Sequence, residues 1–159
     1  MEINPLWAVI AFYPAFPGRE GPLTSFTGHV SPLAGILLRM FSDTLLDHFQ
    51  NPRNAGELPG ATVKVEVSNP VCGDILQLAA ILDGQRIREV RFLCRGCTAA
   101  IAAASLLTEK IKGRELRDTR LLSSESIAQE LDGLPPASFH AAQLAHDALR
   151  ALVARSEAQ

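Results

Sequence analysis

Three consecutive strand-like segments, followed by helical segments, constrain the fold of this chain more than any other feature. Residues 61–68 alternate, with Val63, Val65 and Val67 on one side. A second strand is expected at residues 75–82, and Asp83-Gly84 then forms a strong hairpin turn into a third strand at 87–93. These strands, joined in succession, predict an antiparallel meander.

The helical segments come mainly after the strands. Gly96 opens an expected helix over residues 97–112, and its alanine-rich stretch 99–107 is apolar on every side, which predicts burial. Further helices are expected at 123–131 and 138–155. Strands first and helices afterward is the α+β order. The predicted fold is therefore a three-stranded antiparallel sheet with helices packed on it.

The composition of the chain changes near Met40. Residues 1–39 hold half of the prolines and only four charged side chains. From residue 41 the pattern becomes regular, beginning with a short helix capped by Ser42 in which Leu45 and Phe49 share a face. We therefore expect residues 40–159 to form one domain, and residues 1–39 to be a poorly ordered extension or an upstream start wrongly included.

Charge and cysteine content limit the functional classes. A net charge of -2 gives no electrostatic reason to expect nucleic acid or an anionic membrane as a partner. The apolar run at 6–12 is too short to span a membrane and lacks a basic leader. Three cysteines read poorly as a disulfide framework, whereas in a reducing cytosol they stay thiols. A cytoplasmic location is expected.

Side chains able to bind a metal are concentrated in Cys72-Gly73-Asp74, in Cys94-Arg95-Gly96-Cys97 and at His140. All three cysteines lie in the first two clusters. Thiolate and imidazole ligands suit zinc, iron or an iron–sulfur cluster far better than magnesium or calcium. The pattern indicates a metal or cluster site, provided that these residues converge.

Each candidate ligand also has an ordinary structural interpretation. Cys97 at a helix start would be favoured as a thiolate by unpaired backbone N–H groups, or it could be a small buried thiol. Asp74 could be a turn residue bonding its own backbone. Cys94 falls on the same strand face as Phe92, the expected core side. A lone histidine such as His140 is more often a cap or surface residue.

Residues 41 to about 155 resemble the U-type iron–sulfur cluster assembly scaffold family, which includes the bacterial Isc scaffold and the N-terminal domain of the nitrogen-fixation scaffold. The matching stretches occur in the family's order across roughly three-quarters of the chain. They are Phe41-Ser42-Asp43, Asp47-His48-Phe49, Asn51-Pro52-Arg53-Asn54, Pro70-Val71-Cys72-Gly73-Asp74, Arg91-Phe92, Gly96-Cys97, Ala100-Ile101-Ala102, Ser105-Leu106-Leu107-Thr108-Glu109, Gly113 and Leu134-Pro135-Pro136 before His140.

The resemblance implies a scaffold function and a ligand set. Cys72, Cys97 and His140 would hold a cluster or zinc, and Asp74 would keep the cluster labile enough to be handed on. Such scaffolds receive sulfur from a cysteine desulfurase, gather iron, build a transient [2Fe–2S] cluster and pass it to apo recipient proteins. They are carriers rather than enzymes that turn over a free substrate.

This chain departs from the family pattern at two places. Ala141 stands where the family has its third cysteine, a ligand and principal persulfide acceptor. The proline motif read by a dedicated Hsp70 chaperone ends here in Ala137-Ser138, without the usual valine and lysine, which weakens the case for that partner. We expect Cys94 to replace the missing thiol, which would keep a ligand count of three sulfurs and one nitrogen.

Three alternatives to a cluster scaffold stay open. One is a zinc-bound acceptor of persulfide sulfur on the same fold. Another is a dithiol–disulfide oxidoreductase, although its Cys-x-x-Cys motif normally accompanies a βαβ pattern rather than a meander. The last is a metal-free interaction protein that keeps the fold without the chemistry.

Overall fold

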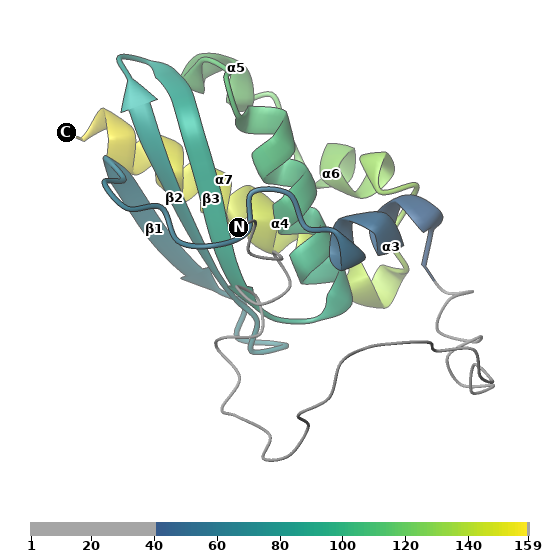
Figure 1. Ribbon diagram of the computed structural model, residues 1–159. Helices are drawn as coiled ribbons and strands as arrows, with labels where there is room; N and C mark the ends of the chain where they lie inside the picture. The colour runs from purple at the N-terminus through teal and green to yellow at the C-terminus, as the bar shows by residue number, and fades with distance from the viewer. Residues whose placement is uncertain (1–40, 159) are drawn as a thin grey trace, which may run out of the picture.

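The computed structural model describes residues 41–158, and the expectation for residues 1–39 lies outside this range. One short helix precedes a run of three strands, and the remaining helices follow (Figure 1). In chain order the elements are α3 (Asp43–Gln50), β1 (Val63–Ser68), β2 (Ile75–Asp83), β3 (Arg86–Arg95), α4 (Thr98–Ile111), α5 (Leu116–Thr119), α6 (Ser124–Glu130), the 3-10 turn η1 (Pro136–Ser138) and α7 (Phe139–Glu157).

The sheet is the predicted antiparallel meander, in the order β1-β2-β3. Its register aligns side chains in rows across the strands, such as Val65 with Leu78 and Phe92. Because successive side chains of a strand point to opposite faces, these rows alternate between core and solvent. The prediction of a three-stranded antiparallel sheet in an α+β fold is confirmed.

The helices α4 and α7 cover one face of the sheet (Figure 1). Helix α7 packs against β1 and β2, and α4 packs against β3 and α7. The alanine-rich α4 is buried along most of its length, as its sequence predicted, because small side chains let neighbouring backbones approach closely. The core therefore lies between the sheet and this helical layer.

Helix α3 packs on α4, and its buried residues differ from those expected from the sequence. Ser42 caps it as predicted, accepting a hydrogen bond from the backbone N–H of Leu45 at 3.0 Å. Its buried residues are Leu45 and His48, whereas Phe49 is 36 % exposed. None of the helices in residues 41–158 combines the length and the hydrophobicity needed to cross a membrane.

Candidate metal site

The candidate ligands come together because two neighbouring strands place their ends side by side. Ile75 at the start of β2 pairs with Arg95 at the end of β3. Asp74 immediately precedes Ile75, and Cys97 follows Arg95 after one glycine. The β1–β2 loop that carries Cys72 therefore lies at the same end of the sheet as the entry to α4.

The β1–β2 loop is held by its own backbone. The N–H of Asn69 donates to the carbonyl of Asp74, and the N–H of Gly73 donates to the carbonyl of Asn69, both at 2.8 Å. Gly73 has φ +74°, a conformation that side chains disfavour. The tight turn leaves Cys72 and its neighbour Val71 exposed, so the thiol is accessible from solvent.

The structure brings three predicted ligands into one group. A sulfur of Cys72, a carboxylate oxygen of Asp74 and a ring nitrogen of His140 all lie within 4.8 Å of one another. His140 reaches this group from the first turn of α7. Two residues of the β1–β2 loop and one of the last helix therefore lie together, and metal binding by them stays a prediction.

Cys97 lies beside this group rather than within it. It is the N-cap of α4, one residue before the helical turn in which it was expected. Its backbone N–H donates to Oδ1 of Asp74 at 3.3 Å, and its thiol is exposed. Asp74 thereby satisfies a free N–H at the start of the helix and connects Cys97 to Cys72 and His140.

Asp74 is the buried member of the site. It is 5 % exposed, and its second oxygen, Oδ2, has no hydrogen-bond partner among residues 41–158. A buried carboxylate oxygen without a partner is costly, and a bound cation would satisfy it. Together with sulfur and imidazole donors, this oxygen fits a metal ion, so the donor chemistry agrees with the predicted site.

Gly96 makes the burial of Asp74 possible, a role that the sequence did not indicate. A Cβ atom at this position would lie 2.9 Å from Cγ and 3.1 Å from Cβ of Asp74, and 3.1 Å from Cβ of Ala100. Carbon atoms normally approach to about 3.5–4.0 Å. The absent side chain therefore leaves the space that the carboxylate occupies.

The surroundings of the site raise the pKa of its thiols, so the thiols hold their protons more strongly than the sequence suggested. Desolvation raises the pKa of Cys97 above its ordinary value, and it outweighs the backbone N–H of Ala100, which acts to lower it. Desolvation, together with the Asp74 carboxylate, also raises the pKa of Cys72. Both shifts favour the protonated thiol in the metal-free protein, so metal binding would have to displace the protons.

Cys94 occupies a different environment. It is 4 % exposed and belongs to the inward row formed with Val67 and Leu76. Burial raises the pKa of its thiol to about 12. Ligation by Cys94 stays a prediction, and this placement favours the alternative of a core thiol. Ala141, where the resemblance implies the family's third cysteine, is fully buried.

One interacting set was not anticipated from the sequence. His48, to which no role was assigned from the sequence, is buried and its Nδ1 lies 2.9 Å from Oγ of Ser105 on α4. The same hydroxyl accepts the backbone N–H of Arg53 at 2.8 Å. The set ties the loop after α3 to the helix whose start carries Cys97, and no local periodicity could have revealed it.

The fold and the site define a class: an α+β domain that offers sulfur, carboxylate and imidazole donors at one end of its sheet. Residues 40–159 match the model of the NifU-like N-terminal domain. The chain belongs to this family.

Named relatives and a solved structure agree with this assignment. The chain is 41 % identical over 111 residues to "Iron-sulfur cluster assembly scaffold protein IscU 1" of Archaeoglobus fulgidus, covering 70 % of this chain and 72 % of the relative. It is 39 % identical over 123 residues to the IscU scaffold protein of Haemophilus influenzae, covering 75 % and 97 %. A candidate scaffold protein for the SUF system from Fervidobacterium islandicum shares the fold, with TM-score 0.65 and 20 % identity over 73 % of this chain and 98 % of that one.

Proposed function

We propose that this protein is a scaffold on which an iron–sulfur cluster is assembled and from which it is handed on. The observation that carries the proposal is the group of Cys72, Asp74 and His140 within 4.8 Å, with Cys97 attached through Asp74. Family membership and relatives named as IscU scaffold proteins support it.

Each residue of the site would contribute a different kind of donor atom. Cys72 and Cys97 would bind iron through sulfur, and His140 would add a nitrogen ligand. Both thiols are exposed, which suits a site that must accept iron and sulfur and later release the product. Asp74 contributes a hard oxygen beside softer donors and is the weakest of the four ligands.

The partners follow from this function. Sulfur would come from a cysteine desulfurase, the cargo would be a [2Fe–2S] cluster, and the recipients would be apo iron–sulfur proteins. Free cysteines suit a reducing compartment, which supports a cytoplasmic location. A dedicated Hsp70 contact is not part of the proposal, because the proline segment Leu134-Pro135-Pro136 continues without the family's lysine.

Anaerobic reconstitution tests the proposal. Protein incubated with ferrous iron and sulfide should develop the visible charge-transfer absorption of a cluster, with matching iron and sulfide content. Cys72→Ser, Cys97→Ser and His140→Ala should each lower metal affinity at least about tenfold. His146→Ala is the matched control, since it removes the same side-chain type from α7 outside the ligand group. A cluster that forms equally well in all variants would contradict the assignment.

Zinc-bound sulfur acceptance is the second candidate. Three donors within 4.8 Å, two from the β1–β2 loop and one from α7, could surround one ion rather than a cluster. Zinc that binds tightly at one ion per chain, in protein that never develops cluster absorption with iron and sulfide, would favour this alternative. Metal analysis of protein purified without oxygen therefore separates the two functions.

A further inference from the structure

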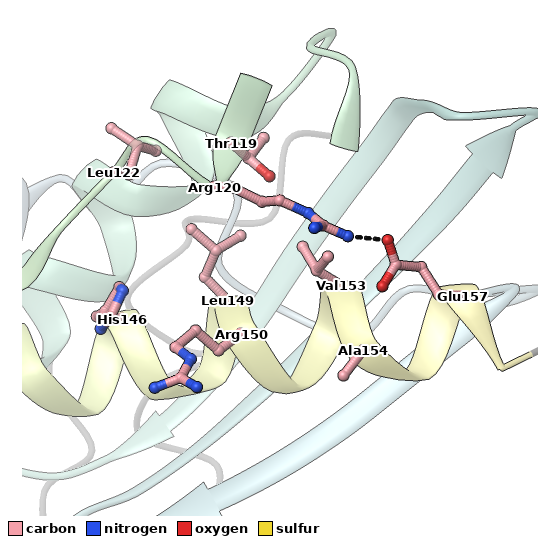
Figure 2. A pocket seen from close by; sticks show the side chains of 9 residues that line it. All are labelled: Thr119, Arg120, Leu122, His146, Leu149, Arg150, Val153, Ala154 and Glu157. Carbon is pink, nitrogen blue, oxygen red and sulfur yellow. Dashed lines mark hydrogen bonds and ion pairs between the residues drawn. The ribbon is translucent and has the colours of Figure 1, made fainter. Parts of the chain in front are cut away.

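A hollow with a volume of about 380 Å³ lies between the α5–α6 connection and the C-terminal half of α7 (Figure 2). Leu149 and Val153 of α7 line it, nine and thirteen residues beyond His140. At 1.5 Å per residue, these positions lie about 14 and 20 Å along the helix from His140. The hollow is therefore separate from the candidate metal site.

The floor of the hollow is apolar. Leu122 from the α5–α6 connection lines the hollow together with Leu149 and Val153 of α7 (Figure 2). Both α7 residues are part of the core and form the bottom of the hollow, with 2 % and 6 % of their surface exposed. Leu121, between the lining residues Arg120 and Leu122 in the sequence, is 86 % exposed. An apolar floor in a concavity of several hundred cubic ångströms is typical of small-molecule sites in proteins.

The rim carries one cation that is free to bind a ligand. Arg120 is already paired with Glu157 across the hollow (Figure 2). Arg150, in contrast, takes part in none of the ion pairs and side-chain hydrogen bonds formed within residues 41–158. It lies at the rim on the side of His146, whose own neighbour is the carboxylate of Glu125. A guanidinium presents a fork of donors that matches a carboxylate.

We propose that this groove binds a small organic carboxylate with an apolar body. The carboxylate would pair with Arg150, and the hydrocarbon part would lie on Leu122, Leu149 and Val153. At about 30 Å³ per water molecule, the volume corresponds to roughly a dozen waters. A short straight-chain acid such as hexanoate fits this size. The proposal is independent of cluster assembly, because no metal ligand lines the groove.

Nuclear magnetic resonance titration of the ¹⁵N-labelled protein with sodium hexanoate tests the proposal. Saturable shifts are expected at residues 119–122 and 146–157, with a dissociation constant on the order of 1 mM. Acetate tests the charge alone and 1-hexanol tests the apolar body alone, and both should bind more weakly than hexanoate. Shifts that do not saturate, or 1-hexanol binding as tightly as hexanoate, would overturn the proposal.

Three variants test which residues contribute to hexanoate binding. Arg150→Gln should weaken hexanoate binding about fivefold, the upper range for an open ion pair. Ala154→Trp should block binding, because Ala154 is an exposed lining residue and the new ring would fill the hollow without disturbing the core. Arg155→Gln, an exposed α7 residue outside the lining, is the control and should bind as the unmodified protein does. Unchanged affinity in both groove variants would rule out this site.

Discussion

Replacing Gly96 with alanine is expected to damage the metal site through Asp74, although Gly96 is not itself a ligand. The new Cβ would lie 2.9 Å from Cγ and 3.1 Å from Cβ of Asp74. Asp74 is 5 % exposed and its Oδ1 accepts the N–H of Cys97, so the carboxylate has little room to retreat. The carboxylate must move away from the helix start or the backbone must shift.

The size of the effect follows from these contacts. The new Cβ falls at least about 0.6 Å short of ordinary carbon contact distances. Inserting a methyl group into a packed site costs about 1–3 kcal/mol. Alanine also restricts the unfolded chain more than glycine does, which offsets about 0.4–1 kcal/mol of this cost. The net loss in free energy of unfolding should therefore be about 1–2 kcal/mol, with a drop in metal affinity of at least about tenfold from the displaced carboxylate.

Urea unfolding and anaerobic metal titration measure the two effects. Gly60→Ala is the matched control, since no atom lies within 4 Å of its added Cβ. Its φ of +74° should cost about 1 kcal/mol in stability while leaving metal affinity unchanged.

A double-mutant cycle with Asp74→Ala tests the cause of the Gly96→Ala effect. If the clash with Asp74 is responsible, Gly96→Ala should cost about 1 kcal/mol less when the carboxyl group is absent. An equal cost in both backgrounds would refute the reasoning and assign the strain to Ala100.

Three further predictions concern single residues. Asp74→Ala should still bind metal, with an affinity lowered about as much as in Gly96→Ala, but should slow cluster transfer to an apo-ferredoxin, followed optically, because the hard ligand in a soft site is lost. Equal transfer rates would remove Asp74 from the mechanism. Cys94→Ala should lower the free energy of unfolding in urea by about 1 kcal/mol through lost packing, and it should leave metal stoichiometry intact. Cys94 would instead be a ligand if this variant lost as much metal as Cys97→Ala and if Ala141→Cys restored the binding. Burial lowers the pKa of His48 below 6.5, so the unfolded state binds more protons and stability should fall as pH drops below about 6.5. His48→Gln should reduce the difference in stability between pH 7.5 and pH 5.5, measured by urea unfolding. An unchanged difference would contradict this role of His48.

The sheet was predictable because its signals are local. Alternation of valines and the Asp83-Gly84 turn place the strands within a few residues of β1, β2 and β3. The four-residue α5 and the 3-10 turn η1 were not predicted, since a single turn is too short to show helical periodicity. Phe49 was placed on a buried face by spacing alone, but the partner helix α4 buries His48 instead.

The metal site was predictable only in its residue types. Cysteine, aspartate and histidine identify the chemistry, but the convergence of Cys72 with His140 depends on how α7 packs against β1. The roles of Gly96 and Ser105 depend on contacts between segments distant in sequence. Such contacts leave no periodic signal, so only the resemblance to known scaffolds could point to the ligand set before the structure.

The Cys94–Cys97 pair shows why motif spacing alone does not define a ligand set. When Cys-x-x-Cys lies in one loop or helical turn, both sulfurs can reach one metal. Here Cys94 belongs to β3, and its register with Leu76 directs it to the core face. Gly96 then ends the strand and Cys97 caps α4 at an exposed position. A shared metal would require the Cys94 side chain to leave its row, and that displacement would oppose the packing that stabilises the sheet.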